Sequence, residues 1–272
     1  MPASISESLR RLLAHPLSVG VDLDHPAATV LRRRILQEKH FLRKLYEEWY
    51  RMITVEVPQG DRPVLELGSG AGFLGEFMPG LVTSDIITLP DLSLVLDAHR
   101  IPFKNDALRA IVMIDVLNHL GNVRRFLKEA TRCVTPGGVI VMIEPWVSPW
   151  SRLIYRRLHH EPFEPGVISW EFPARGPLSS ANGALPWMIF ERDMQQFSLE
   201  FPEWRIKSVK PDMPFCYLAS GGMAWRAFAP GLFFGSFRRI ERWLSPWMRH
   251  LAMFALIVLE RLKNNEQPGT SS

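Results

Sequence analysis

The stretch Val64-Leu-Glu-Leu-Gly-Ser-Gly-Ala-Gly-Phe73 decides how the chain folds. Its first residues form a short, mostly apolar run, which is typical of a strand buried on both faces of a parallel sheet. Gly68, Gly70 and Gly72 follow at alternate positions, where the chain must turn and let a ligand approach the backbone. A helix is expected next, and its N-terminus would offer free N–H groups to an anionic ligand. The stretch therefore predicts a cofactor site at the end of a central strand.

Two classes of cofactor are compatible with these glycines. Gly70, Gly72 and Gly75 have the G-x-G-x-x-G spacing of dinucleotide-binding proteins, which is a weak signal on its own. Glu66 lies within the strand, where its carboxylate would repel a pyrophosphate but would suit an ammonium or a sulfonium. The residues of this loop leave both classes open.

Length and composition indicate one globular domain over residues 1–272. Hydrophobic residues make up 47% and charged residues 22% of the chain, which is an ordinary balance for a folded protein. The net charge of +4 is modest and no block of Lys or Arg stands out, so no nucleic-acid partner is expected. Cys133 and Cys216 lack metal-type spacing, and Met1–Leu17 lacks the core of a signal peptide. A cytoplasmic location with reduced thiols is therefore expected.

Strand and helix patterns alternate through the first half of the chain. One amphipathic helix is predicted over Pro26–Ile53, with Pro26 near its first turn. It would either pack on the domain or form a wall of the substrate pocket. Further strands are predicted at Leu81–Asp85, Leu94–Leu96, Ala110–Ile114 and Val139–Ile143, with a short helix at Phe73–Met78, another from Val123 to Ala130, and a turn at Thr135-Pro-Gly-Gly138. The second helix of the series is nearly missing, because only Ile86–Ser93 separates two strands. This alternation predicts an α/β fold with a doubly wound, Rossmann-like parallel sheet.

Acidic residues end several of these strands. Asp85 ends the second, where an acid of a doubly wound sheet can accept both ribose hydroxyls of an adenosine. Asp97 follows the third strand, Asp115 the fourth, and Glu144 the fifth. Because the carboxyl ends of parallel strands meet at one edge of a sheet, these acids are expected close to the ligand.

Residues 63–145 resemble the cofactor half of class I S-adenosylmethionine-dependent methyltransferases, most closely the small-molecule type that includes quinone-biosynthesis C-methyltransferases. The matching features are Glu66-Leu-Gly-Ser-Gly-Ala-Gly72, Asp85, Asp97-Ala98 with Pro102-Phe103, Asp115 through His119-Leu120, and Pro136-Gly137-Gly138. The resemblance implies S-adenosylmethionine as cofactor, with Glu66, Gly68, Ser69, Gly70 and Gly72 at its methionine end. It also implies that Asp85 and Ile86 contact the ribose side, that Asp97 and Ala98 flank the adenine, and that Asp115 and Val116 lie beside the amino acid and methyl group.

The same resemblance helps with the second half of the chain. A helix at Phe190–Phe201 and a strand at Trp204–Val209 are predicted from the residues. Family topology makes Met253–Leu259 the seventh strand, antiparallel and inserted between the fifth and the sixth. The implied organisation is an N-terminal helical cap over 1–60, a cofactor half over 61–145, substrate-side insertions at 146–187 and 210–250, and the last strand within 251–262.

The two insertions are rich in aromatic residues. The first carries several Trp, Tyr and Phe residues, and the second interleaves such residues with arginines, most clearly in an amphipathic helix predicted over Phe234–Met248. Tryptophan with arginine on one helix suits a membrane interface. The alternative is that the aromatic side chains form a second small core. Both remain open from the sequence, as does a pocket for a lipid-like acceptor.

Histidines near these segments are candidates for proton transfer. His119 follows the fourth strand and is the first candidate for a general base, although a structural role is the competing interpretation. His159, Glu161 and Glu144 are weaker candidates. His159 and His160 lack a third ligand at helical spacing, so no metal site is expected.

The sequence thus favours a methyltransferase that acts on an apolar or amphipathic small molecule, such as a lipid, a quinone or an envelope glycolipid precursor. Peripheral association with the inner membrane face is a further expectation. An NAD-dependent oxidoreductase that uses Gly70, Gly72 and Gly75 is one alternative. A non-catalytic, membrane-associated module with the same fold is another.

Overall fold

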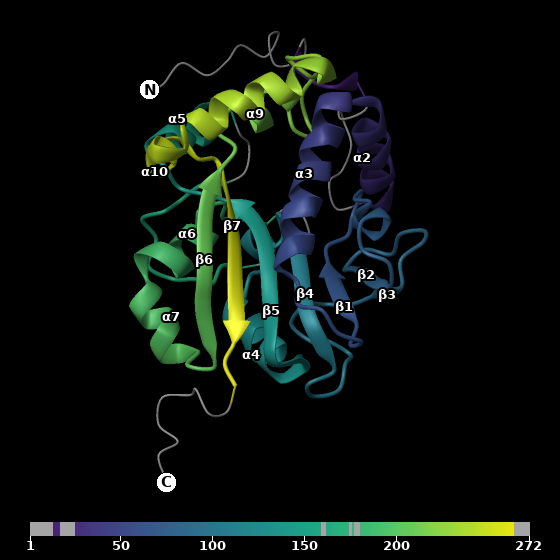
Figure 1. Ribbon diagram of the computed structural model, residues 1–272, viewed down its shortest axis with the longest axis vertical. Helices are drawn as coiled ribbons and strands as arrows, with labels where there is room; N and C mark the ends of the chain where they lie inside the picture. The colour runs from purple at the N-terminus through teal and green to yellow at the C-terminus, as the bar shows by residue number, and fades with distance from the viewer. Residues whose placement is uncertain (1–12, 17–24, 159–161, 174–175, 177–179, 264–272) are drawn as a thin grey trace.

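The computed structural model describes residues 13–16, 25–158, 162–173, 176 and 180–263. A seven-stranded sheet in the order β3-β2-β1-β4-β5-β7-β6 forms the centre of the molecule (Figure 1). The strands are β1 Val64–Leu67, β2 Leu81–Asp85, β3 Leu94–Val95, β4 Leu108–Ile114, β5 Val134–Pro145, β6 Trp204–Asp212 and β7 Phe254–Arg261. The predicted doubly wound, Rossmann-like fold is confirmed.

Strands β1 to β5 run parallel, and β7 pairs antiparallel with both of its neighbours. The predicted insertion of the last strand between the fifth and the sixth is therefore confirmed. All four residues of β1 are buried, as expected for a strand covered on both faces. The parallel strands consequently end at one edge of the sheet, where the acids predicted from the sequence follow them.

The predicted turn at Thr135–Gly138 is wrong, because these residues belong to β5. The pairing of β4 with β5 shifts register between Leu108 and Ala110, opposite this segment. Gly137 has a φ of +81°, and a Cβ on Gly138 would lie 2.7 Å from the Arg109 carbonyl oxygen. The glycines therefore allow an irregular stretch within a continuing strand, as in a β-bulge.

The single helix predicted over Pro26–Ile53 is two helices, α2 Pro26–Glu38 and α3 His40–Glu56. Lys39 breaks the helix with φ −91° and ψ 86°. Its Nζ donates to the backbone carbonyls of Gly222 and Trp225, the latter at 2.8 Å. This pairing with a distant loop overrides the helical periodicity of the sequence. In Figure 1, α3 lies in front of the sheet and α2 lies beside α3.

Other helices lie behind the sheet or over the carboxyl edge of its parallel strands. These are α4 Val123–Cys133, α5 Pro149–Leu158, α6 Leu185–Trp187, α7 Met194–Glu200, α8 Cys216–Ser220, α9 Phe234–Trp243 and α10 Met248–Leu251. The side chain of Asn122 caps α4 by accepting from Arg125 N at 2.9 Å. The helices α5, α9 and α10 gather at one end of the molecule, above β6 and β7 in Figure 1.

Two predicted helices are shorter than expected. The helix predicted at Phe190–Phe201 is divided into a π-helical segment, Met188–Arg192, and α7, with the break at Asp193. Asp193 accepts a hydrogen bond from the indole of Trp170 at 2.8 Å, which fixes the break. The helix predicted at Phe234–Met248 ends at Trp243 and is followed by a 3-10 segment, Ser245–Trp247. Pro246 in that segment has no N–H to continue an α-helix.

Aromatic residues of both insertions contribute to the core. Trp146 and Trp170 of the first insertion are fully buried. In the second, Phe234 and Phe237 pack edge-on against Phe41 of α3, with ring centroids 5.3 and 5.5 Å apart. The prediction of a second small core is therefore correct for these residues. No helix in the described ranges is long and apolar enough to cross a bilayer.

Candidate active site

The loop after β1 holds three glycines in conformations or contacts that exclude a larger residue. Gly68 and Gly70 have φ of +65° and +48°, in the left-handed region that favours glycine. A Cβ on Gly68 would also lie 2.4 Å from Cγ2 of Val116, which follows β4. The loop is thus built so that the backbone at the end of β1 lies against the segment after β4.

Tyr50 of α3 fixes the far end of this loop. Its hydroxyl accepts from the backbone N–H of Phe73 at 3.0 Å, and a Cβ on Gly72 would lie 2.7 Å from the same oxygen. The helix predicted at Phe73–Met78 is only a 3-10 turn, Leu74–Glu76. The predicted helix N-terminus for an anionic ligand is therefore wrong, since a single turn has little dipole and Tyr50 already takes the Phe73 N–H.

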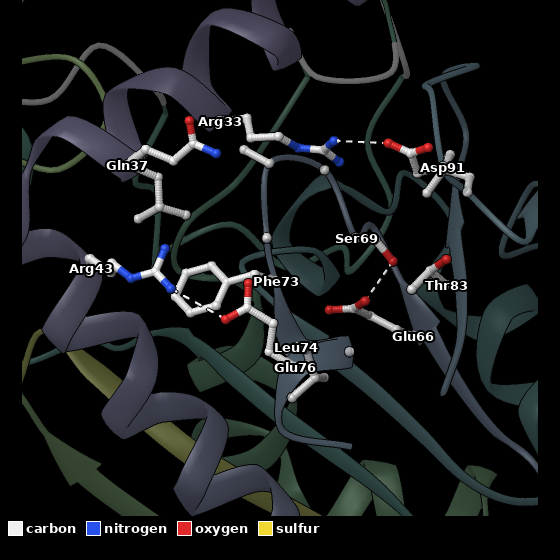
Figure 2. A pocket seen from close by; sticks show the side chains of 16 residues that line it. Arg33, Gln37, Arg43, Glu66, Ser69, Phe73, Leu74, Glu76, Thr83 and Asp91 are labelled. Atoms are coloured by element: carbon white, nitrogen blue, oxygen red, sulfur yellow. Dashed lines mark hydrogen bonds and ion pairs between the residues drawn. The ribbon is translucent and has the colours of Figure 1, made fainter. Parts of the chain in front are cut away.

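Glu66 is buried at the base of the glycine loop. Its carboxylate accepts from the Ser69 hydroxyl at 2.6 Å (Figure 2). That hydroxyl in turn accepts from Ser84 N at 3.0 Å. Burial raises the pKa of Glu66 to about 7; the nearby Asp85 carboxylate adds to this rise and the Ser69 bond opposes it. A cation bound at this position would favour the ionised carboxylate.

Asp85 links the end of β2 to the glycine loop. Its two carboxylate oxygens accept from Gly70 N and Ile87 N, each at 3.0 Å. Burial raises the pKa of Asp85, and these two N–H bonds oppose the rise. A carboxylate has about four acceptor positions, so Asp85 retains capacity for ligand hydroxyls. Ile86 beside it is 49% exposed, which leaves an apolar surface free at the end of the strand.

Asp97 and Ala98 lie after β3. Asp97 accepts from both the backbone and the ring of His99, at 2.8 and 2.6 Å, and Ala98 is buried. Partial burial would raise the pKa of Asp97, but the hydrogen bonds and charge of His99 hold it below the usual value. Asp97 is therefore an exposed, ionised acceptor at the edge of the site.

Glu144, at the end of β5, organises the segment after β4. Its fully buried carboxylate accepts from the backbone N–H groups of Val116 and Leu117 at 2.9 Å and from that of Asn118 at 3.4 Å. Burial raises the pKa of Glu144 to about 8, and the charge of Asp115 adds to the rise. These contacts leave Glu144 facing backbone groups, which does not favour the predicted role as a general base.

Asp115 begins this segment with a φ of +57° and is exposed. Asn118 donates to its carboxylate at 3.2 Å. His119 is half-buried, and its Nδ1 lies 3.0 Å from the Ser180 carbonyl oxygen. A carbonyl only accepts, so this contact places the proton on Nδ1 and the lone pair on Nε2. The weaker candidates His159 and Glu161, and His160 beside them, lie outside the described residues.

The glycine loop opens into a cleft of about 350 Å³, within the size range of small-molecule sites (Figure 2). Of the residues predicted for the cofactor, Glu66, Ser69, Gly70 and Gly72 line it. Its opposite wall comes from the two N-terminal helices, which contribute Arg33, Leu36, Gln37 and Arg43. Arg33 reaches across to Asp91 at 3.6 Å.

The sequence left open that the helix over Pro26–Ile53 forms a wall of the substrate pocket, but it indicated neither these side chains nor the role of Tyr50. The helical pattern predicts that this region packs on the domain, but not which side chains face the loop after β1. The break at Lys39 gives α2 and α3 separate directions, and no local signal indicates it. The sequence showed only the apolar stripe of the helix predicted over Pro26–Ile53.

A second, narrow cavity of about 10 Å³ lies beside Asp115. Four aromatic side chains, two prolines and a glycine complete its lining: Tyr155, Phe163, Tyr217, Phe254, Pro145, Pro162 and Gly183. Tyr155 and Phe163 stack in parallel with ring centroids 4.5 Å apart. Asp115 is therefore the carboxylate of an otherwise aromatic and aliphatic wall. His119 lines neither this cavity nor the larger cleft.

The first cleft fits the cofactor implied by the sequence better than a nicotinamide dinucleotide. Glu66 is a buried carboxylate beside glycines that accept no Cβ, and Asp85 retains free acceptor positions. In dinucleotide-binding proteins the third glycine is needed because the helix packs closely against the strand at that point. The corresponding residue here is Gly75, and a Cβ on it would meet nothing within 4 Å. The loop therefore lacks both the helix and the packing on which that pattern depends.

Residues 65–142 match the family model described as "Methyltransferase domain". These residues form a methyltransferase domain. The match spans β1 to β5, and so contains the glycine loop and the segment after β4.

Solved structures of methyltransferases are similar in fold to this methyltransferase chain. A geranyl diphosphate C-methyltransferase from Streptomyces coelicolor A3(2), in complex with Mg²⁺, geranyl diphosphate and S-adenosyl-L-homocysteine, is 12% identical with a TM-score of 0.48, over 92% of this chain and 89% of that one. An S-adenosylmethionine-dependent methyltransferase from Mesorhizobium loti is 15% identical with a TM-score of 0.44, over 79% and 96%. No curated protein gives a significant match. These similarities say nothing about the acceptor of this methyltransferase.

Proposed function

We propose that this methyltransferase transfers a methyl group from S-adenosylmethionine to an apolar or amphipathic small molecule, such as a lipid, a quinone or an envelope glycolipid precursor. The observation that supports this acceptor class is the lining beside Asp115, where four aromatic side chains surround a space that is only about the size of one water molecule and would widen when an acceptor enters. Aromatic side chains provide large apolar contact areas with defined geometry.

The cofactor would lie in the cleft at the glycine loop. Glu66 would face its ammonium or sulfonium, Asp85 and Ile86 would contact its ribose side, and Asp97 and Ala98 would flank its adenine. Gly68, Ser69, Gly70 and Gly72 would supply backbone and hydroxyl contacts. Asp115 and Val116 would lie beside its amino acid and methyl group. When bound, S-adenosylmethionine supplies a methyl group activated by its sulfonium.

The residues of the chain would contribute mainly by positioning. Gly68 allows Val116 to approach the end of β1, and Glu144 holds the backbone of Val116 and Leu117 so that Asp115 faces the aromatic cavity. Holding an acceptor in line in a dry site can account for much of the acceleration of such a displacement. An oxygen or nitrogen acceptor also needs a proton acceptor, and we propose His119 Nε2 for that role; because His119 lines neither cavity, it would act through a bridging water.

Calorimetric titration with S-adenosylhomocysteine and with NAD tests the cofactor. The proposal expects binding of the first and none of the second; the reverse result would favour the oxidoreductase alternative. Binding of S-adenosylhomocysteine without any methyl transfer would favour the non-catalytic module.

Incubation of a cell extract with methyl-labelled cofactor tests the acceptor class. Label is expected in the lipid-soluble fraction, and label confined to protein would contradict the proposal. Phe163→Trp should fill the aromatic cavity and lower transfer while S-adenosylhomocysteine affinity stays unchanged. Leu199→Trp, on the exposed surface of α7, is the matched control.

A further inference from the structure

The helices α5, α9 and α10 form one surface at the carboxyl edge of the parallel strands. In Figure 1 they lie together at one end of the molecule, and α9 extends from there toward α3. We call the exposed side of α5 together with that of residues 239–249 the end surface. It lies outside both cavities described above.

Large apolar side chains are exposed along the α9 part of the end surface. Ile240, Trp243 and Trp247 recur at helical spacing, and Trp243 is 73% exposed. The two indoles contact each other with ring centroids 6.0 Å apart. The opposite side of α9 is already committed to the core through Phe234 and Phe237. The helix therefore has a second apolar face with no partner among the described residues.

Exposed positive charge surrounds these indoles. Six arginines are exposed on the end surface: Arg152, Arg156 and Arg157 of α5, and Arg239, Arg242 and Arg249 of the α9–α10 region. None of them forms an ion pair with a carboxylate of the described chain. Helix α5 contains no acidic residue.

The one acidic residue of α9 is turned inward. Glu241 is fully buried and accepts from Arg238 at 2.6 Å and from the backbone N–H groups of Phe215 and Cys216 at 2.8 and 2.7 Å. Arg238 is also buried and bonds Asp212 and Glu48. Arg238 is therefore not part of the exposed basic face of α9, because its side chain belongs to a buried cluster of charged groups. As a result, the charged groups exposed on the end surface are all basic or histidine side chains.

We infer that the end surface docks on an anionic lipid bilayer. Indoles and arginines together suit the interfacial region, where the rings lie at headgroup level and the cations meet anionic headgroups. Exposed apolar groups on helices whose exposed charged groups are all of one sign distinguish this surface from an ordinary solvated face. Charge complementarity therefore specifies a negatively charged lipid surface.

The docking surface also lies over the proposed acceptor cavity. Tyr155 lines that cavity from the inner side of α5, while Arg152 and Arg156 lie on the exposed side of the same helix. A docked molecule would therefore hold the carboxyl edge of its sheet against the bilayer. This second step rests on the proposed function, whereas docking itself does not.

Co-sedimentation of the full chain with vesicles tests the inference. The chain should pellet with phosphatidylcholine vesicles that contain phosphatidylglycerol and remain in the supernatant with phosphatidylcholine alone. Each arginine removed should lower the partition coefficient by about fivefold, so Arg156→Ala with Arg239→Ala should lower it well over tenfold. Trp243→Ala with Trp247→Ala should also lower it, and added salt should weaken binding of the parent.

Two control pairs match these changes in charge and in apolar area. Arg62→Ala with Lys104→Ala removes the same charge from exposed residues that precede β1 and β4, at the opposite edge of the sheet. Ile168→Ala with Leu199→Ala removes exposed apolar side chains elsewhere. Both controls should pellet like the parent, and every variant should keep its thermal transition.

Equal pelleting of the parent and the tryptophan or arginine pair would overturn the inference, as would equal binding to both vesicle types or to neither. Retained S-adenosylhomocysteine binding in the same samples would show that such a failure concerns docking alone. Loss of S-adenosylhomocysteine binding with normal pelleting would instead contradict the proposed function.

Discussion

At the scale of single residues, two buried acids support the glycine loop: Glu66 lines the candidate cofactor cleft, and Asp85 holds the loop through Gly70. Glu66 and Asp85 lie on neighbouring strands and are joined by hydrogen bonds that run through Ser69 and Gly70. Burial raises the pKa of both. A buried acid with a raised pKa that lines a cleft, as Glu66 does, is typical of a functional site, because a ligand can stabilise its charge.

Asp85→Ala should weaken the affinity for S-adenosylhomocysteine by about 1–3 kcal/mol, because ribose hydroxyls would lose a buried acceptor. Calorimetric titration measures the change. Asp91→Asn is the control: this exposed acid lines the cleft at the glycine loop and, among the described residues, forms an ion pair with Arg33 alone, so its loss should cost less than about 1 kcal/mol. Unchanged affinity in the Asp85 variant would remove this residue from the site.

The pH dependence of cofactor binding should reflect Glu66. Since its pKa lies at about 7, the carboxylate is largely neutral at pH 6 and ionised at pH 8, and a cationic ligand prefers the ionised form. The affinity for S-adenosylmethionine should therefore rise over this range, with release of a proton on binding below pH 7. Titration in buffers of different ionisation enthalpy counts that proton. Glu66→Gln should abolish the dependence; a persistent slope would assign it to another group.

At the scale of elements, the loop after β1 is held by two neighbours distant in sequence. Val116 after β4 approaches Gly68, and Tyr50 of α3 binds the backbone of Phe73. The glycines are thus needed for these close approaches as well as for a ligand. The segment after them is a single 3-10 turn, so the element presents backbone and not a helix dipole.

Gly68→Ala should destabilise the fold by roughly 1–3 kcal/mol, since its φ is +65° and the new Cβ would overlap Val116. Chemical denaturation measures the loss. Adding Val116→Ala should restore only the part of the lost stability that comes from the steric overlap, and not the part that comes from the positive φ. Gly75→Ala in the same loop is the control, because a Cβ there meets nothing within 4 Å and should change stability by less than about 0.5 kcal/mol. Equal effects at both glycines would refute this account.

At the scale of the whole molecule, the buried and the paired acids respond to pH in opposite directions. Glu66 and Glu144 have folded-state pKa values of about 7 and about 8, above the unfolded value of 4.5. Their contribution to stability is complete below pH 4.5 and is lost as pH rises to about 8. Hydrogen bonds from Arg132 and Arg124 lower the pKa of Glu129 and Glu200, whose contributions are lost as pH falls below 4.5.

Glu144→Gln should therefore reduce the fall in unfolding free energy between pH 5 and pH 8, because glutamine stays neutral while still accepting from Val116 and Leu117. Denaturant titrations of the parent and the variant at several pH values test this, and the difference between the two isolates Glu144 from the other titrating groups. Parallel curves would show that Glu144 does not titrate in this window.

The sequence by itself determined the class of fold and indicated four residues that line the cleft: Glu66, Ser69, Gly70 and Gly72. The apolar run Val64–Leu67, the glycines after it and the acids at strand ends are local signals, because burial and turn geometry act on consecutive residues. The strand Leu81–Asp85 was predicted with its exact bounds for this reason. The order of the sheet, with β7 between β5 and β6, followed from the family resemblance.

Only the tertiary structure decided where these elements break and what faces them. Lys39 interrupts a continuous helical pattern because its ammonium reaches the carbonyls of residues 222 and 225. The Tyr50 hydroxyl binds the Phe73 N–H, where the sequence predicted a helix N-terminus with free N–H groups. Arg238 and Glu241 are buried as a pair, which leaves arginines without acidic neighbours on the end surface. These outcomes depend on contacts between residues distant in the chain, which periodicity and spacing do not encode.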